Sequence, residues 1–209
     1  FVDAQGNIRG HQFGEGNYAR SEQVIRRLLT EAGQTHLPPP ADPAAADLQG
    51  VAAQADMGNL RSPETYLGHA RAEQFASPGG QRSDTAFDYT LPTVLALNQW
   101  GLSGQWTITD EAAQLQRAGG RIAFQFHARD LHLVLAPGQD GKPVRFRVWL
   151  DGKPLPATDA GSDVGADGSG VVNEHRLFQL VRQRGTVGPH RFEIEFLDAG
   201  VQAYAFTFG

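Results

Sequence analysis

An alternation of apolar and polar residues with a period of two is the feature of this sequence that most constrains its fold. In "RIAFQFH" the apolar residues Ile122, Phe124 and Phe126 fall on one face of an extended chain. The same alternation recurs in "DLHLVLA", "PVRFRVWL", "HRFEIEF" and "AYAFTFG". Such a pattern is typical of half-buried strands in an antiparallel sheet.

Turn residues separate these segments and point to an all-β domain. The chain contains 25 glycines and 12 prolines, which interrupt the alternating segments at "PGQDGK", "DGKPLP" and the glycine-rich 160s. We therefore predict that residues 62–209 form a β-sandwich or jelly roll. In its final strand, the alternation predicts that Tyr204, Phe206 and Phe208 lie on one side.

Residues 1–33 show a different pattern, in which a hairpin precedes a helix. "AQGN" supplies turn residues between two short strands, and "GEGN" supplies a second turn. Asn17 is expected to cap a helix over 18–32, and Gly33 is expected to end it, because asparagine favours the N-cap and glycine the C-terminal stop. The predicted apolar stripe consists of Val24, Ile25, Leu28 and Leu29.

This first segment is too small to be stable alone, because a hairpin and one helix bury little apolar surface. We expect residues 1–33 to be held by another molecule, by the sandwich, or by an N-terminal part of the same protein present as a separate chain. Residues 34–61, with three consecutive prolines at 38–40 and many alanines, are interpreted as a semi-rigid linker.

Composition and charge exclude several functions. The chain has no cysteine, which excludes disulfides, thiolate metal sites and thiol catalysis within it. The net charge is −5 and no basic run exceeds Arg26-Arg27, which argues against a nucleic-acid partner. No apolar stretch reaches the roughly 18 residues that a membrane span needs.

Two sets of segments resemble a known family in the same order along the chain. "FVDAQGNIRGHQFGEGNY" and "VIRRLL" resemble the last hairpin and last helix of a thioredoxin-like domain. "SPETYLGHARAEQF", "LNQWGLSGQW", "GGRIAFQFHARDLHLVL", "RLFQLVRQ" and "FEIEFLDAGVQAYAFTFG" resemble the module that follows thioredoxin in DipZ-type cytochrome c biogenesis and thiol–disulfide interchange proteins.

The resemblance implies a layout in which a thioredoxin-like domain with a Cys-x-x-Cys dithiol precedes a carbohydrate-binding-module-like sandwich of galactose-binding type. The dithiol would precede Phe1, so no redox residue can be assigned here. By this resemblance the parent protein is a thiol–disulfide oxidoreductase, whereas this chain alone is not an enzyme. The implied location is periplasmic or otherwise extracytoplasmic, tethered through an N-terminal membrane domain, and a cytoplasmic location stays open.

Aromatic side chains are the first candidates for ligand binding, because an aromatic face can contact the apolar face of a sugar ring. The candidates are Trp100, Trp106 and Trp149, with Tyr66 and Tyr204. A four-residue loop at 101–104 would put Trp100 and Trp106 on opposite faces of a hairpin, whereas a five-residue loop would put them on one face. The alternative is that one of them is core and the other covers it.

Charged residues near these aromatics form the second set of candidates. Arg71 and Glu73 offer a forked donor and a carboxylate acceptor for hydroxyl groups. The alternative is an ion pair that anchors the segment to the sandwich. Glu174 and Arg176 have the same two interpretations, and they share a face if the surrounding segment is a strand.

An acidic, glycine-rich stretch, "DVGADGSGVVNE", is a candidate calcium site. Its oxygen-bearing residues fall at positions 1, 5, 7 and 12 of a calcium loop, as Asp163, Asp167, Ser169 and Glu174. Position 3 is Gly165, and the flanking helices of an EF-hand are missing from the pattern. The alternative is a hairpin loop without a metal, and no other cofactor is expected.

Three hypotheses of function follow. The sandwich binds a carbohydrate or a cell-envelope partner and so positions the redox domain. Alternatively, it is a ligand-free structural module that forms homo-oligomers or docks the redox domain. The third hypothesis, that this chain is an enzyme by itself, has no motif in its favour, because neither a nucleophile elbow nor a distinct carboxylate pair occurs.

Overall fold

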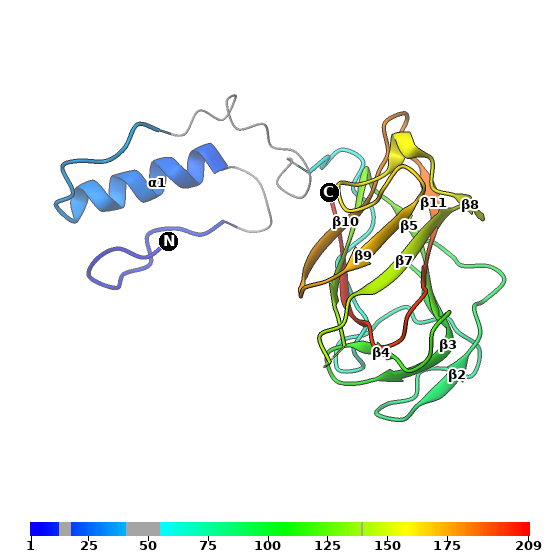
Figure 1. Ribbon diagram of the computed structural model, residues 1–209. Helices are drawn as coiled ribbons and strands as arrows, with labels where there is room; N and C mark the ends of the chain where they lie inside the picture. The colour runs from blue at the N-terminus through cyan, green and yellow to red at the C-terminus, as the bar shows by residue number, and fades with distance from the viewer. Residues whose placement is uncertain (13–17, 41–54, 139) are drawn as a thin grey trace. The chain divides into compact units, whose positions relative to one another are not determined.

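The computed structural model describes residues 1–12, 18–40, 55–138 and 140–209 (Figure 1). The chain divides into two compact units, Phe1–Gln54 and Ala55–Gly209, which are taken in turn. The second unit contains all the named strands.

The first unit opens with the predicted hairpin turn. Val2 and Ile8 form an isolated antiparallel bridge, and the amide of Asp3 donates to the carbonyl of Asn7 at 3.0 Å. Gly6 adopts φ +83°, a left-handed conformation that glycine tolerates best. The two short strands are therefore reduced to a single bridge. The second predicted turn and the Asn17 cap lie outside the described residues.

Helix α1 (Tyr18–Glu31) follows, and it ends as predicted. Gly33 has φ +90°, and its amide donates to the carbonyl of Thr30 at 3.0 Å. The amide of Gln34 donates to the carbonyl of Leu29 at 3.0 Å. These two bonds form a Schellman motif, which satisfies carbonyls that the end of the helix would otherwise leave unpaired.

The apolar side chains of this unit stay at its surface. No residue of α1 is buried, and Ile25 and Leu29 are 47% and 39% exposed. Val2 and Ile8 of the hairpin are 59% and 76% exposed. The hairpin and α1 line an apolar groove of about 380 Å³. Patches of this kind usually mark a surface that another element or molecule covers.

The second unit is a two-layer antiparallel β-sandwich, which confirms the predicted mainly β fold. Every pairing between its named strands is antiparallel. A short 3₁₀ turn, η2 (Ala157–Asp159), interrupts the chain after β8. The strands are β1 (Thr65–Tyr66), β2 (Phe87–Tyr89), β3 (Trp100–Ile108), β4 (Ala113–Leu115), β5 (Arg121–His127), β6 (Asp130–Ala136), β7 (Val144–Leu150), β8 (Lys153–Pro154), β9 (Ser169–Val172), β10 (Arg176–Arg182), β11 (Pro189–Phe196) and β12 (Gln202–Phe208).

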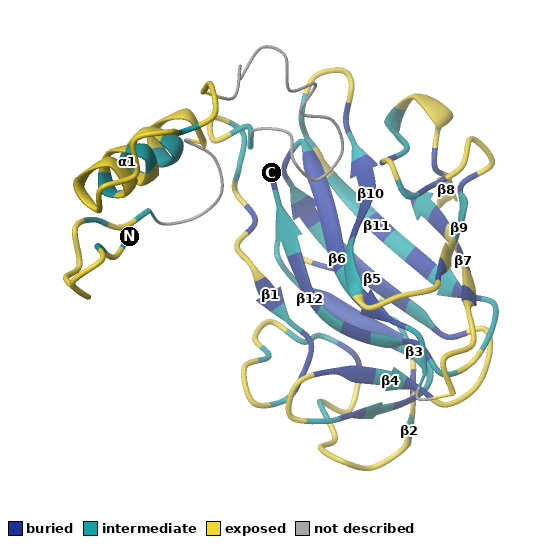
Figure 2. Ribbon diagram, turned by 60° about the vertical axis from the view of Figure 1, so that its left-hand side comes forward, coloured by how far each residue is buried: buried dark blue, intermediate teal, exposed yellow. Residues whose placement is uncertain are grey.

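Strand β3 joins the two layers. One layer contains β10, β6, β12, β4 and the second half of β3, with β1 and β2 added at β12 and β3. The other contains the first half of β3, then β5, β11, β7 and β8, with β9 added at β7. Large aromatic rings fill the space between the layers. The ring centroids of Phe124 in β5 and Phe206 in β12 lie 4.8 Å apart. Figure 2 shows this buried core in dark blue.

Strand β3 changes from one layer to the other along its length, and this change sets the position of both tryptophans. The predicted loop at 101–104 is therefore wrong. Trp100 pairs with Phe124 of β5, and Trp106 pairs with Leu115 of β4. Gly104, with φ +90°, lies between the two pairings. The segment is thus one continuous strand that changes layers, so no hairpin loop of either length forms. Both tryptophans are 0% exposed.

The predicted alternation is correct for β5, β6, β7 and β11, but it breaks in β12. The register between β12 and β6 shifts between Ala203 and Ala205, as at a β-bulge. Phe206 is fully buried, whereas Tyr204 is half-buried and its ring stacks on His175 at 4.6 Å. Tyr204 therefore does not join the phenylalanine cluster, because the extra residue in the strand interrupts the period of two.

Candidate ligand-binding cleft

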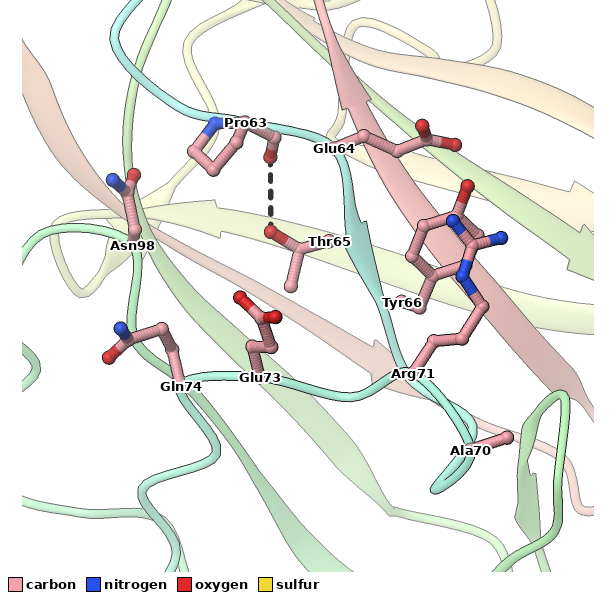
Figure 3. A pocket seen from close by; sticks show the side chains of 9 residues that line it. All are labelled: Pro63, Glu64, Thr65, Tyr66, Ala70, Arg71, Glu73, Gln74 and Asn98. Carbon is pink, nitrogen blue, oxygen red and sulfur yellow. Dashed lines mark hydrogen bonds between the residues drawn. The ribbon is translucent and has the colours of Figure 1, made fainter.

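Two cavities adjoin beside strands β1 and β12, and we call them together the Tyr66 cleft. Their volumes are about 390 Å³ and 470 Å³, and both are lined by Tyr66, Ala70 and Arg71. The first is also lined by Pro63, Glu64, Thr65, Glu73, Gln74 and Asn98, and the second by Gly68, Asp110, Glu111, Tyr204 and Ala205. Figure 3 shows the first cavity from close by.

Backbone hydrogen bonds fix the walls of the cleft. β1 pairs with β12, so that Tyr66 lies opposite Ala205, and the amide of Leu67 donates to the carbonyl of Tyr204 at 2.8 Å. A Cβ atom at Gly68 would lie 2.2 Å from the carbonyl carbon of Glu111. Only glycine permits this close approach, and it brings the turn after β1 against the turn that carries Glu111.

Tyr66 and Arg71 form the shared centre of the cleft. The guanidinium carbon of Arg71 lies 3.5 Å from the centroid of the Tyr66 ring, which is a cation–π contact. A hydrogen bond with the carboxylate of Glu64 raises the pKa of Tyr66 above its usual value. Figure 3 shows the three side chains side by side at one end of the first cavity. The cleft thus offers an aromatic ring, a planar donor and a carboxylate within a few ångströms.

Glu73 stands at the opposite wall, and Trp100 holds its backbone. The indole Nε1 of Trp100 donates to the carbonyl oxygen of Glu73 at 2.8 Å. The carboxylate of Glu73 is exposed and points toward Thr65 in Figure 3. Trp100 is fully buried beneath this wall, so it cannot present its ring to a ligand. Its role as a direct ligand contact is therefore corrected to that of a support.

Asn98 and Gln74 complete the first cavity. The hydroxyl of Ser62 donates to Oδ1 of Asn98 at 2.8 Å, which fixes the orientation of the amide. Asn98 and Gln74 adopt φ +68° and +59°, respectively, which is uncommon for residues other than glycine. Their amides add neutral donors and acceptors to the charged groups of the cleft.

Tyr204 and Glu111 form the far wall of the second cavity. Burial raises the pKa of Tyr204, and the negative charge of Glu111 raises it further. The ring of His175 covers one face of Tyr204, with an angle of 16° between the two planes. Sequence reasoning included Tyr204 among the aromatic candidates but missed Glu64, Asp110 and Glu111, because the turn that brings the last two here is distant in sequence.

The sequence-predicted residues Tyr66, Arg71 and Glu73 therefore come together in one cleft. No ion pair between Arg71 and Glu73 occurs in the described structure, because the guanidinium lies over the tyrosine ring instead. Trp106 does not take part. It is fully buried, and its Nε1 donates to the carbonyl of Ser103 at 2.8 Å.

The other predicted ligand residues lie elsewhere. Trp149 is half-buried in the other layer of the sandwich, where the guanidinium of Arg121 lies 5.1 Å from its ring centroid. Arg176 makes ion pairs with Glu174 at 2.9 Å and with Asp163 at 2.7 Å, and it lies 3.8 Å from the ring centroid of Phe178. Glu174 and Arg176 thus form an ion pair with each other, while their part in ligand binding stays a prediction.

The carboxylates of the predicted calcium loop accept hydrogen bonds from protein donors. Asp163 accepts hydrogen bonds from Arg176 and from the backbone amide of Gln179, the latter at 2.7 Å. Asp167 accepts from the hydroxyl of Ser169 at 2.6 Å. The residues that the structure describes contain no group of three or more His, Cys, Asp or Glu that could hold a metal. Calcium binding by this loop stays a prediction.

A second polar cluster is buried away from the cleft. His132 is 6% exposed, and its ring nitrogens lie 3.4 Å from Nε2 of Gln179 and 3.4 Å from Oγ1 of Thr207. Burial lowers the pKa of His132 below its usual value, although the nearby carboxylate of Asp130 opposes the shift. Asp130 itself is almost fully buried and pairs with Arg182 at 2.6 Å.

The fold and the cleft define the described C-terminal part as a two-layer β-sandwich with a ligand-sized polar cleft. Residues 62–209 match the family model of the thioredoxin-like C-terminal domain, and the chain belongs to this family. In the described parts of the chain, no helix is long and apolar enough to span a membrane.

Comparison with known proteins confirms the DipZ-type resemblance. Protein DipZ of Mycobacterium bovis and Protein DipZ of Mycobacterium tuberculosis are each 30% identical to this chain over 215 residues. The match covers 100% of this chain and 26% of each relative, so the chain spans about a quarter of their length.

Among solved structures, part of this chain is similar to parts of two carbohydrate esterases. A family two carbohydrate esterase from Clostridium thermocellum in complex with cellohexaose is 19% identical, with a TM-score of 0.37 over 47% of this chain and 27% of the esterase. An active-site mutant of such an esterase from the same organism is also 19% identical, with a TM-score of 0.42 over 54% and 31% of the two chains.

Proposed function

We propose that this chain is the C-terminal part of an extracytoplasmic thiol–disulfide oxidoreductase, and that its sandwich binds a carbohydrate of the cell envelope through the Tyr66 cleft. The family membership and the match to Protein DipZ support the thioredoxin-like context. With no cysteine, this chain contributes no dithiol. In this proposal the redox chemistry belongs to the preceding region of the protein, and the sandwich holds that region close to a saccharide.

The observation that carries the proposal is the convergence of Tyr66, Arg71 and Glu73 in one cleft. A sugar presents an apolar face of C–H groups and a rim of hydroxyls, so its site needs an aromatic surface and planar polar side chains. Tyr66 supplies the ring, Arg71 up to five donors, and Glu73 two acceptor oxygens. Arg71 can turn away from the ring when a ligand takes its place, because its side chain is exposed.

Calorimetric titration with glycans tests the proposal. The chain should bind at least one member of a panel of glucose-, mannose- and N-acetylglucosamine-based oligosaccharides with a dissociation constant on the order of millimolar or tighter. Tyr66→Ala and Glu73→Gln should each weaken binding by about tenfold, which corresponds to roughly 1.4 kcal/mol. Failure of every glycan to bind would eliminate the carbohydrate function.

Trp149→Ala is the matched control for this titration. Trp149 is a half-exposed aromatic residue of the same sandwich, but it does not line the cleft. We expect its removal to leave glycan affinity unchanged. A loss of binding in Trp149→Ala together with normal binding in Tyr66→Ala would move the site to the other layer of the sandwich.

A second proposal is that the first unit completes the redox domain, and the apolar surface of this unit favours it. The groove between the hairpin and α1 is lined by Phe1, Val2, Ile25, Leu28 and Leu29 among others. We propose that the remaining strands of a thioredoxin-like sheet cover this groove in the intact protein. Light scattering over a range of concentrations would distinguish this from self-association, because only a self-associating chain gains mass as its concentration rises.

A further inference from the structure

A third cavity lies beside the Tyr66 cleft, along strands β4 and β12. Its volume is about 310 Å³, and the glutamines Gln114, Gln116 and Gln202 line it together with the backbone of Gly138 and Gly200. We call it the glutamine cavity. Asp140 also lines it, and its carboxylate pairs with Lys142 at 2.9 Å. The lining therefore combines amides with a carboxylate, whereas that of the Tyr66 cleft includes aromatic rings and a guanidinium.

A chain of hydrogen bonds connects the two sites. The hydroxyl of Tyr204, which lines the Tyr66 cleft, donates to Oε1 of Gln202 at 3.4 Å. Nε2 of Gln114, which lies opposite Gln202 in the β4–β12 ladder, donates to the same oxygen at 3.3 Å. The three side chains therefore lie on the same face of the layer, so Tyr204 forms the boundary between the cleft and the cavity.

The length of this surface exceeds that of a single sugar. Tyr66 and Thr65 lie opposite Ala205 and Phe206 of β12, and Gln202 lies at the start of the same strand. At about 3.4 Å per residue, the four steps from Phe206 to Gln202 cover at most roughly 14 Å, because the bulge between Ala203 and Ala205 shortens the strand, before the cavities at either end are added. A monosaccharide in the cleft would leave the glutamine cavity empty.

The glutamines also have the chemistry to read hydroxyl groups. Each amide carries an acceptor oxygen and two N–H donors without a net charge. One donor of Gln202 is used by the carbonyl of Pro137 at 3.1 Å, and one of Gln116 by the carbonyl of Gln114 at 3.2 Å. These bonds hold the amides in place while Gln116 stays exposed to solvent. Amides fixed in this way bind with a lower entropic cost than free side chains.

We propose that the glutamine cavity is a second subsite of the Tyr66 cleft, and that the ligand is an oligosaccharide chain long enough to occupy both. This inference rests on the proposed carbohydrate function and adds the size of the ligand to it. The Tyr66 cleft binds one part of the chain, and Gln114, Gln116 and Gln202 bind sugar units further along it. Affinity should therefore depend on chain length.

The test is a titration of the chain with one oligosaccharide series, from one to six sugar units, built from a glycan that binds in the panel above. We expect affinity to rise with length until both subsites are filled, by about tenfold for the added contacts. Gln202→Ala and Gln116→Ala should each abolish this rise. Gln116→Ala should also leave the affinity for the shortest binding member unchanged, because Gln116 makes no contact with the Tyr66 cleft. Glu73→Gln should weaken every member of the series.

Gln125→Ala is the matched control, because Gln125 is a half-buried glutamine of β5 in the other layer and lines neither cavity. Gln116 is exposed, so its variant keeps the test valid if Gln202→Ala fails to fold. Affinity that is independent of length, or a length dependence that survives both variants, would overturn the subsite while leaving the carbohydrate function intact. Absence of binding at every length would instead overturn the proposed function, and the inference with it.

Discussion

The first unit and the sandwich both have apolar residues at regular spacing, but only the sandwich buries them. In α1 none of the residues is buried, although Val24, Ile25, Leu28 and Leu29 form a stripe at helical spacing. In the sandwich, Phe124, Phe192 and Phe206 are all 0% exposed. The difference shows that periodicity identifies the apolar face of an element, whereas burial depends on whether a complementary face is present.

Hydrogen exchange should show the largest contrast between the two units. In the isolated chain, we expect the backbone amides of 1–33 to exchange faster than those of β5, β6 and β11 by a factor on the order of a thousand or more. The reason is that strand amides are released only by global unfolding, whereas α1 has no core to hold it. Slow exchange across α1, measured by mass spectrometry, would contradict the comparison and show that something in the chain covers this unit.

Truncation of apolar side chains should give the next largest effect. Phe206→Ala removes a fully buried ring, whose centroid lies 4.8 Å from that of Phe124 and 5.9 Å from that of Phe192. We expect it to lower the free energy of unfolding by about 3–5 kcal/mol. Urea denaturation followed by tryptophan fluorescence measures this, because Trp100 and Trp106 lie in the same core.

Ile25→Ala is the counterpart in α1, where Ile25 is 47% exposed. We expect this substitution to change the free energy of unfolding of the sandwich by no more than about 0.5 kcal/mol. If Ile25→Ala lowered the free energy of unfolding as much as Phe206→Ala, Ile25 would have to belong to a core shared with the sandwich. That result would contradict the difference in burial between the two units.

The pH dependence of stability should be a smaller effect that is confined to the sandwich. Burial lowers the pKa of His132 from the ordinary value of 6.5, so the unfolded state takes up a proton more readily than the folded state. The contribution of neutral His132 to the free energy of unfolding is therefore fully present above about pH 6.5. It is lost as the pH drops from there toward the folded-state pKa. Arg145 lowers the pKa of Asp198 to about 2, so the stabilisation from this carboxylate is present across the tested range and is lost only below about pH 4.

Urea midpoints at pH 7.5 and 5.0 measure this effect. The wild-type midpoint should be lower at pH 5.0, and His132→Gln should reduce the difference between the two pH values, since glutamine does not titrate. An unchanged pH dependence in the variant would assign the effect to other groups.

Removal of divalent cations should have the smallest effect. Asp163 and Asp167 bind Arg176 and Ser169 in the structure. We therefore expect the melting temperature to stay within about 1 °C when EDTA or calcium is added, because a ligand that does not bind the folded state cannot stabilise it. A clear rise with calcium would instead support the loop 163–174 as a metal site.

Much of the fold could be predicted from the sequence because strand identity depends on local alternation. β5, β6, β7 and β11 were recognisable since one face of each strand is buried along its full length. β12 was misjudged at Tyr204, because a bulge depends on how the neighbouring strand is paired. The passage of β3 between layers was likewise invisible, since a glycine such as Gly104 is equally typical of a turn.

The candidate site was predictable only where its residues are close in sequence. Tyr66, Arg71 and Glu73 fall within one turn segment, so their chemistry could be recognised together. Glu111, Tyr204 and Gln202 reach the same surface through β12 and the approach of Gly68 to Glu111. Long-range pairing of this kind leaves no local signal.

The sequence by itself determined that this chain is mainly β, carries no thiol chemistry and resembles the end of a DipZ-type protein, because composition, period and motif are properties of the linear chain. Tertiary structure decided that Trp100 and Trp106 support the core, that Trp149 lies away from the cleft, and that the predicted calcium ligands bind protein donors. The physical reason is that burial and hydrogen-bond partners are set by which strands meet, and strands distant in sequence meet only in the folded chain.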